Sequence, residues 1–278
     1  MKIGFIGLGN MATAIIGGLL REDTALSSED GNATVITAAN IIGSAKTEAT
    51  RQKRAEQFGI AVTASNREVA EAADVLVLAV KPQFFPEVIA EIRDAVSENT
   101  LVISIAAGLT LERIAGLFDR NVTAMRLIRC MPNTPALVNA GCTAVVPGPG
   151  ATEADEALCL RLMESFGRAI VIPERLMDAA SATAGSSPAF VFMFIEALAD
   201  GAVAAGMPHA QAYEFAAAAV AGSAQLVLET GRHPGDLKDM VCSPGGTTIE
   251  GVRALEEGAF RASVMNAISA CVEKAKAL

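Results

Sequence analysis

Histidine and paired cysteines are nearly missing from this sequence, and several classes of enzyme are excluded with them. There are two histidines, His209 and His233, each beside a proline, and five cysteines that form no Cys-x-x-Cys pair. A Ser-His-Asp or Cys-His hydrolase needs a placed histidine, and a zinc site needs clustered ligands, so we expect neither a hydrolase nor a metal centre. Scattered thiols without a pairing pattern are typical of a cytoplasmic protein, and that is the location we expect.

Positive charge and long apolar runs are also in short supply. The chain has 22 Lys and Arg residues against 31 Asp and Glu residues, which gives a net charge of −9 at pH 7. Because there is no net positive field, we expect no nucleic-acid partner and no anionic membrane partner. Glycines interrupt the apolar residues of the first ten positions, so no secretory signal is predicted. No uninterrupted apolar stretch has the length of a bilayer span.

Hydrophobic residues are abundant, at 51% of a 278-residue chain, which is enough for two modest domains. Short runs rich in Val, Ile and Leu alternate with stretches of helical spacing in the first part of the chain. This alternation predicts an α/β, Rossmann-like domain over residues 1–172, with a mostly parallel, doubly wound sheet. The predicted strands lie at 2–7, 33–39, 73–80, 100–108, 122–130, 141–148 and 168–173.

After Pro173 the strand-like runs stop, and Ala-rich segments with helical spacing predict an all-α domain over residues 173–278. Ser187 and Pro188 fit the N-cap and first position of a helix that is apolar on nearly every side. A domain of this size cannot bury such a helix alone, so we expect a homodimer formed through the helical domain. The Ala-rich run at 215–222 would allow the close helix approach that this interface needs.

A glycine fingerprint lies directly between the first predicted strand and the helix that follows it. Residues 7–12 read G-x-G-x-x-A, in which Gly7 permits the tight turn, Gly9 lets a pyrophosphate approach the backbone, and Ala12 allows close helix packing. The N-terminus of the next helix would then direct its free N–H groups at the phosphates. The sequence therefore predicts a dinucleotide site in the first domain.

The choice of dinucleotide depends on the end of the second predicted strand, which is Asn40. An NAD-preferring site carries Asp or Glu there, to hold the ribose 2′-hydroxyl. A neutral residue followed by Ser44, Lys46, Arg51, Lys53 and Arg54 favours NADP(H), with NAD(H) as the alternative. A solvated basic helix face explains each of these cations equally well.

A second glycine-rich segment, CSPGGTTIE at 242–250, lies between two helical stretches. Thr247 with Glu250 three residues later fits a capping box that starts the last long helix. A loop of free N–H groups at a helix N-terminus can hold a carboxylate, and the hydroxyl of Thr248 would then be spare. A plain turn between helices explains the same residues, so both interpretations stay open.

The scarcity of acid–base side chains limits the chemistry that the two segments can perform together. Hydride transfer from a reduced nicotinamide to a C=N bond that is already cationic fits, because the protein then mainly positions both reactants.

Six segments of the chain carry a resemblance to one known family. They are IGLGNMA at 6–12, AVKPQ at 79–83, SIAAG at 104–108, RCMPNTPA at 129–136, AGSSPAFVF at 184–192 and LKDMVCSPGGTTIEG at 237–251. In this order and spacing, the chain resembles pyrroline-5-carboxylate reductase from end to end. The resemblance implies reduction of Δ1-pyrroline-5-carboxylate to L-proline with NAD(P)H, the last step of proline biosynthesis. It also implies dimers, or rings of dimers, joined through the helical domain.

The resemblance also implies roles for particular residues. The cofactor is expected to meet a pyrophosphate loop, two asparagines near the adenosine ribose, and three residues on the nicotinamide side. These are, in that order, Ile6, Gly7, Leu8, Gly9, Asn10 and Met11; Asn40 and Asn66; and Val80, Lys81 and Ala107. The substrate carboxylate is expected to meet the 243–248 loop, with Thr248 bonded to the ring nitrogen. The substrate residues are Ser243, Gly245, Gly246, Thr247, Thr248 and, on a weaker match, Glu174.

Two other functions compete with this one. A 3-hydroxyacid dehydrogenase shares the order of domains, but it needs a catalytic lysine on the first long helix after the sheet, and residues 184–200 contain none. A protein that only senses a dinucleotide would keep the glycine fingerprint. It would have no use for an anion cradle with a spare hydroxyl in the other domain.

Overall fold

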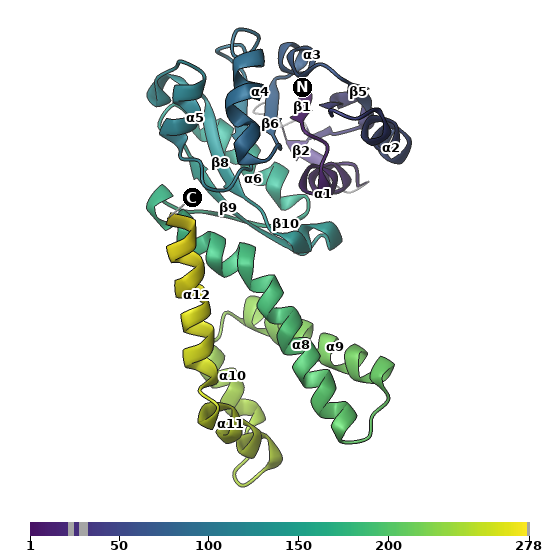
Figure 1. Cartoon of the computed structure of the whole chain (residues 1–278), viewed down its shortest axis with the longest axis vertical. Coiled ribbons are helices and arrows are strands. Elements are labelled where there is room, and N and C mark those ends of the chain that lie inside the picture. The colour runs from purple at the N-terminus through teal and green to yellow at the C-terminus, as the bar shows by residue number, and fades with distance from the viewer. Residues whose placement is uncertain (22–24, 28–32, 277–278) are drawn as a thin grey trace. The chain divides into compact units, whose positions relative to one another are not determined.

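An eight-stranded sheet organises the first part of the chain in the computed structural model (Figure 1), which describes residues 1–21, 25–27 and 33–276. Contacts divide the chain into two compact units. Unit 1 comprises Met1–Gly185 with the end of the chain from Lys274, and unit 2 is Ser186–Glu273. The boundary predicted between residues 172 and 173 stays a prediction.

The sheet of unit 1 has the strand order β10-β9-β8-β7-β6-β1-β4-β5, and all neighbours are parallel except β8 and β9. Its strands are β1 Ile3–Ile6, β4 Ile41–Ser44, β5 Ala61–Thr63, β6 Val75–Leu78, β7 Leu101–Ser104, β8 Leu127–Met131, β9 Gly141–Pro147 and β10 Gly167–Val171. The central strands β1, β6 and β7 are buried along their whole length, as expected for strands covered on both faces. The predicted mostly parallel, doubly wound sheet is confirmed.

Helices cover both faces of this sheet. They are α1 Asn10–Leu19, α2 Glu48–Phe58, α3 Asn66–Ala72, α4 Phe85–Ile92, α5 Leu111–Leu117, α6 Glu153–Glu164 and the short α7 Met177–Ala180. Alternate residues of one strand point to opposite faces, so Val75 and Val77 join the core under α1 and α6, whereas Leu76 and Leu78 join the core under α3, α4 and α5.

The strand predicted at 33–39 is wrong. Only Ala33–Val35 is extended there, as β3, and it pairs with β2, Ala25–Ser27, in a separate two-stranded sheet. The second parallel strand beside β1 is β4, in register from Ile3↔Ile41 to Ile6↔Ser44. Sequence pattern also missed the edge strand β5, because three residues are too few to show an alternation.

Unit 2 is entirely helical, as predicted. Its helices are α8 Ser187–Ala204, α9 His209–Thr230, α10 Pro234–Val241, α11 Thr247–Glu257 and α12 Phe260–Lys276, whose last residues belong to unit 1. Within residues 186–273, all of which the structure describes, four side chains are buried: Ala199, Ala212, Ala216 and Leu237. Three are alanines, which let α8 and α9 approach closely but contribute little apolar area.

The start of α8 differs from the expectation. Ser187 already lies inside the helix, and the residue before it, Ser186, has helical dihedral angles and no capping side-chain bond. A π-helical segment, Ser181–Ser186, joins α7 directly to α8, so no loop precedes Pro188. The continuous helical segment Glu174–Ala204 has 31 residues and is long and apolar enough to cross a membrane, and 6% of its most apolar part is buried. This corrects the expectation that no such stretch exists, although an interface helix can be equally long and apolar.

Candidate active site

The glycine loop lies at the carboxyl end of β1 and has the backbone form that its sequence requires. Gly7 has φ of +95°, and a Cβ atom there would lie 2.9 Å from both the carbonyl oxygen of Ala79 and a methyl group of Val80. Its N–H donates to the carbonyl oxygen of Ser44 at 3.0 Å, which ties the loop to the end of β4. Only glycine fits this turn without strain.

Gly9 is the N-cap residue of α1 and faces open space. A Cβ atom built on Gly9 would meet no other atom within 4 Å, and the first turn of α1 carries no acidic residue. The helix therefore presents free N–H groups and no opposing charge to an anion. The form of the loop Ile6–Met11, with the Leu8 side chain buried, is compatible with binding a phosphate at its backbone.

Val80, Lys81 and Ala107 lie at the same edge of the sheet as the glycine loop. The N–H of Ala79 donates to the carbonyl oxygen of Ile6 at 2.9 Å, so the ends of β1 and β6 are side by side. Ala107 follows the neighbouring strand β7. In doubly wound sheets a dinucleotide lies across this edge, where the strand order reverses around β1.

Asn40 is not at this edge, because it precedes β4 instead of following it. Its amide donates to the carbonyl oxygen of Met1 at 3.1 Å, and its Oδ1 accepts from the backbone N–H of Thr37 at 3.0 Å. Asn40 therefore lies at the amino ends of β1 and β4, and the expectation that it lies near the adenosine ribose is wrong. The residue that ends β4, the second parallel strand, is Ser44, which is uncharged like Asn40.

Asn66 does lie at the carboxyl edge of the sheet, although it follows β5 and belongs to a different strand–helix unit. Its Oδ1 accepts a 2.7 Å hydrogen bond from the hydroxyl of Ser44, and its Nδ2 donates to Glu91 at 2.7 Å. Sequence reasoning placed Asn66 here by resemblance alone and did not single out Glu91.

Two of the four cations noted from the sequence form hydrogen bonds at this edge. Arg51 donates to the carbonyl oxygens of Ala45 and Lys46, and Arg54 donates through Nε to the carbonyl oxygen of Leu8 at 3.4 Å. Basic side chains of α2 thus flank the loop after β4. Cations at these positions would attract a 2′-phosphate, so NADP(H) is still the expected cofactor although Asn40 lies elsewhere.

The second glycine segment, in unit 2, forms a tight turn in front of α11. Gly245 has φ of +68°, and the N–H of Gly246 donates to the carbonyl oxygen of Ser243 at 3.0 Å. A Cβ atom on Gly246 would lie 2.3 Å from the hydroxyl oxygen of Ser243. The segment therefore forms a turn that places Gly246 directly before the first helical residue of α11.

The capping box predicted for this helix is wrong. Gly246 is the N-cap residue and makes no side-chain bond, while Thr247 is the first helical residue. Glu250 is paired with Arg253 at 3.0 Å instead of reaching back to the cap. Thr247 and Thr248 are both exposed in the first turn of α11, so two hydroxyls are presented where one was expected.

Glu174 has partners inside unit 1. One carboxylate oxygen accepts from the backbone N–H of Leu111 at 2.9 Å and from the guanidinium of Arg129 at 3.1 Å. The same oxygen thus ties the start of α5 to β8. Its role beside a substrate stays a prediction.

Alternative nucleophiles and metal ligands are poorly placed in the described residues. The thiols of Cys130 and Cys159 lie 3.5 Å apart in the core, and the hydrogen bond between them, together with burial, raises the pKa of Cys130 well above its usual value. A neutral buried thiol is not a nucleophile. No group of three or more His, Cys, Asp or Glu residues that could hold a metal occurs in the described part of the chain.

Comparisons with known proteins match both halves of the chain. A family model described as pyrroline-5-carboxylate reductase dimerisation matches residues 174–278, and one described as NADP oxidoreductase, coenzyme F420-dependent, matches residues 2–108. The chain is 50% identical over 277 residues to a pyrroline-5-carboxylate reductase of Escherichia coli, covering 100% of this chain and 98% of the relative. It is 39% identical to one of Arabidopsis thaliana, covering 100% and 95%.

Solved structures of similar proteins have the same architecture. A pyrroline-5-carboxylate reductase of Coxiella burnetii superposes with a TM-score of 0.89 at 33% identity, covering 99% of this chain and 97% of its own. A Plasmodium falciparum pyrroline carboxylate reductase crystallised with NADP bound has a TM-score of 0.81 at 29% identity, covering 100% and 97%.

Proposed function

Because the chain belongs to the pyrroline-5-carboxylate reductase family, we propose that it reduces Δ1-pyrroline-5-carboxylate to L-proline, the last step of proline biosynthesis. NADPH is the proposed hydride donor, with NADH as the alternative. The observation that carries the proposal is the end-to-end match at 50% identity, which spans both the glycine loop and the 243–248 segment. This makes the protein an NAD(P)H-dependent oxidoreductase that acts on a C=N bond.

The residues of unit 1 fit a dinucleotide. The open face of Gly9 leaves room for a pyrophosphate against the backbone, and the acid-free first turn of α1 supplies donors for it. Lys46, Arg51 and Arg54 would meet a 2′-phosphate beyond the end of β4. When bound, the reduced nicotinamide supplies the hydride, and Val80, Lys81 and Ala107 would hold that ring in place.

The residues of unit 2 fit an imino acid. The turn at Gly245 and Gly246 and the N-terminus of α11 offer backbone donors to a carboxylate. Below the pKa of the imine, the ring nitrogen of the substrate is already protonated and cationic. The hydroxyl of Thr248 needs only to accept that N–H and hold the ring carbon toward the hydride donor, so no side-chain acid is required.

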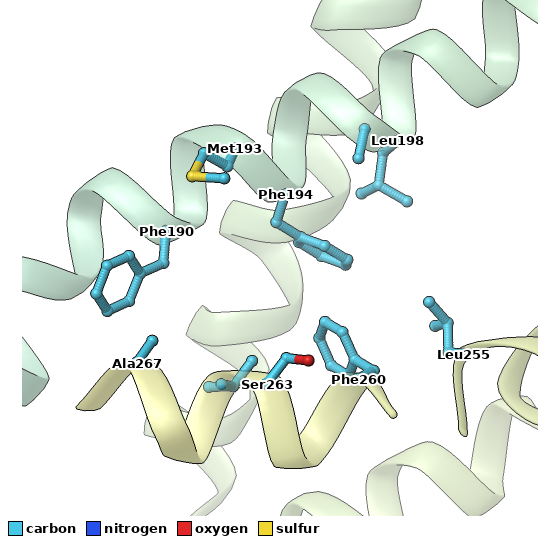
Figure 2. Close-up of a pocket in the computed structure, with 10 residues that line it drawn as sticks. Phe190, Met193, Phe194, Leu198, Leu255, Phe260, Ser263 and Ala267 are labelled. Atoms are coloured by element: carbon cyan, nitrogen blue, oxygen red, sulfur yellow. The ribbon is translucent and has the colours of Figure 1, made fainter. Parts of the chain in front are cut away.

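Two copies of the chain pair through the helical domain in this proposal. Apolar side chains of α8, α11 and α12 line an open cavity of about 450 Å³, in which the rings of Phe194 and Phe260 face each other with centroids 5.8 Å apart (Figure 2). The match to the dimerisation model over residues 174–278 supports a homodimer built on this surface. A ring of such dimers is the higher assembly that we propose. The proposed location is the cytoplasm, which is in keeping with the five free cysteines.

A turnover assay tests the function. The purified protein is mixed with NADPH or NADH and with the five-membered or six-membered cyclic imino acid, and loss of the reduced cofactor is followed by absorbance. We expect turnover with the five-membered substrate. Binding of the cofactor without any turnover would favour a dinucleotide sensor instead, and oxidation of a 3-hydroxyacid would favour the dehydrogenase.

Substitutions in the 243–248 segment test the role of the hydroxyl. Thr248→Ala is expected to lower kcat/KM by about 10- to 100-fold, the loss of one hydrogen bond to a charged group, without abolishing turnover. Thr248→Ser keeps the hydroxyl and is expected to lose much less. Gly246→Ala forces the Ser243 hydroxyl aside and is expected mainly to raise KM. A fully active Thr248→Ala variant would rule out the positioning mechanism.

A further inference from the structure

A chain of hydrogen bonds links three separate segments of unit 1 at the carboxyl edge of the sheet. The Ser44 hydroxyl donates to Oδ1 of Asn66 at 2.7 Å, and Nδ2 of Asn66 donates to a carboxylate oxygen of Glu91 at 2.7 Å. Ser44 is 1% exposed, and its carbonyl oxygen accepts the N–H of Gly7. The chain therefore begins in the core beneath the glycine loop and ends on the surface of α4.

These bonds fix the orientation of the Asn66 amide. An asparagine side chain has one acceptor oxygen and two N–H donors. Ser44 occupies the oxygen and Glu91 occupies one N–H, so one N–H remains for a ligand. The Ser44 hydroxyl can donate or accept, so the Glu91 carboxylate, which only accepts, is the partner that fixes the amide: a turned amide would bring its oxygen against that carboxylate.

The remaining donor lies where the adenosine ribose of a dinucleotide is held. In βαβ nucleotide folds, the residue at the end of the strand that follows the glycine loop contacts the ribose 2′ position. Here that strand is β4 and it ends at Ser44, whose side chain leads to Asn66. The acidic residue of an NAD-type site is missing from β4. A carboxylate, that of Glu91, is instead linked to Ser44 through Asn66 by two successive hydrogen bonds.

We propose that Glu91, acting through Asn66, limits the preference of this protein for NADPH over NADH. Glu91 orients the free N–H of Asn66 toward the ribose 2′ oxygen, and its negative charge opposes a 2′-phosphate there. Lys46, Arg51 and Arg54, on the other side of the β4 end, attract the same phosphate. The balance between these groups sets the ratio of affinities. This inference rests on the proposed function, because it deepens the assignment of its cofactor.

Glu91→Gln separates charge from orientation, because the amide oxygen of glutamine can still accept from Asn66. Dissociation constants of NADPH and NADH are measured by fluorescence titration of the intact protein, without substrate. We expect the variant to favour NADPH over NADH by about three- to tenfold more than the wild type does at low salt. The difference should shrink as salt is added, since the charges are solvent-exposed. Glu98→Gln removes an equal charge at the amino edge and is expected to leave the ratio unchanged.

The orientation of Asn66 is tested by Glu91→Ala, which removes the acceptor as well as the charge. NADH is expected to bind more weakly to Glu91→Ala than to Glu91→Gln, because the free N–H of Asn66 is then no longer held toward the ribose. In an Asn66→Ala background the two Glu91 variants are expected to bind NADH equally. An unchanged ratio in Glu91→Gln, in a protein that binds both cofactors, would overturn this inference and leave the proposed reduction intact. Equal NADH affinities of Glu91→Gln and Glu91→Ala when Asn66 is present would also overturn it. Failure of the wild type to bind either cofactor would overturn the proposed function itself.

Discussion

Unit 1 and unit 2 differ in how much of their own apolar surface they cover. In unit 1, whole strands and the facing sides of the helices are buried, and the core continues on both faces of the sheet. In unit 2, helices of 18 and 22 residues bury one and two residues, whereas Met193, Phe215 and Met265 are each more than 60% exposed. Unit 1 therefore has an extensive core of its own, whereas we expect unit 2 to cover its exposed apolar side chains with a second copy of the chain.

The same difference applies to the two proposed binding segments, one in each unit. The glycine loop of unit 1 is tied to its core by hydrogen bonds, such as that from Gly7 to Ser44. The Ser243–Thr248 segment of unit 2 is held mainly by its own turn and is largely exposed. We therefore expect the cofactor site to depend on the fold of one chain and the substrate site to depend on dimerisation.

The largest effect is expected from a charge placed on the exposed face of α8. Met193→Asp would put an unpaired carboxylate into the apolar surface that we propose for the dimer, once in each copy. We expect dissociation to be favoured by at least about 100-fold, with loss of turnover, because a buried unpaired charge is strongly unfavourable. Sedimentation equilibrium over a range of protein concentrations measures this change.

A matched control places the same charge on unit 1. Val35 is 52% exposed, and Val35→Asp is expected to leave the dimer intact. If Met193→Asp were as dimeric as the wild type, the dimer would not be formed through this apolar surface of unit 2. The comparison between the units would then not explain the assembly.

A smaller effect, confined to unit 1, is expected from its glycine loop. Gly9→Ala adds a methyl group that meets no protein atom, so the thermal stability should not change. The methyl group would fill the space of the pyrophosphate, and we expect NADPH to bind about 10- to 100-fold more weakly, by analogy with losing one or two charge-assisted hydrogen bonds. Calorimetric titration and thermal unfolding of the same sample separate the two outcomes.

Gly7→Ala is the contrasting variant, because its added methyl group would clash with Ala79 and its φ is positive. We expect a lower Tm as well as weaker binding. Equal stability losses in the two variants would contradict the distinction between a glycine needed for the turn and a glycine needed for the ligand.

Substitution of Asp155 tests whether the stability of unit 1 is independent of dimerisation. It is 1% exposed and accepts hydrogen bonds from Arg126, and although burial acts to raise its pKa, the bonds from Arg126 and Thr152 hold that pKa below the usual value. Asp155→Asn removes the charge from a pair whose Arg126 side chain is 35% exposed, and we expect it to lower the free energy of unfolding by about 1–3 kcal/mol at pH 7. The loss should not depend on protein concentration.

The sign of the pH dependence follows from the lowered pKa. The stabilisation by Asp155 is fully present above the pKa of the unfolded chain, about 3.9, and is lost as the pH falls through the lower pKa of the folded state. The difference between wild type and variant should therefore shrink below about pH 4. Asp119→Asn, at an exposed pair with Arg93, is the control and should cost less than about 1 kcal/mol. A difference that grows in acid would contradict this account.

The fold was largely predictable because its signals are local and redundant. Three features indicate the same layout: the glycine fingerprint after β1, the continuous apolar run of β6, and the change from strand-like to Ala-rich helical segments after Pro173. The second strand was misplaced because ATVIT at 33–37 has stronger β-propensity than IIGS at 41–44, which contains a glycine. Parallel pairing with β1 decides between the two segments, and pairing partners cannot be read from propensity.

The site was predictable in its glycines and less so in its polar contacts. Thr247 and Glu250 have the spacing of a capping box, but Arg253 lies one turn further along and pairs with the glutamate. The bond from Arg54 to the Leu8 carbonyl and the link from Ser44 through Asn66 to Glu91 join residues far apart in sequence. Such contacts depend on the order of strands in the sheet, and no local pattern marks them.

The smallest effect is expected at Asn40, where the two edges of the sheet in unit 1 can be compared directly. From sequence alone, Asn40→Asp should shift preference toward NADH by repelling the 2′-phosphate. In the structure Asn40 lies at the amino ends of the strands, bonded to Met1 and Thr37, while the glycine loop lies at the carboxyl ends. We therefore expect Asn40→Asp to change the ratio of NADPH to NADH affinity by less than about twofold, because the added charge is far from the cofactor and screened. Lys46→Glu, which reverses a charge beside the end of β4, should weaken NADPH binding and leave NADH binding nearly unchanged. If Asn40→Asp changed the ratio more than Lys46→Glu did, the adenosine ribose could not lie at the carboxyl edge, and the placement of the cofactor on unit 1 would be wrong.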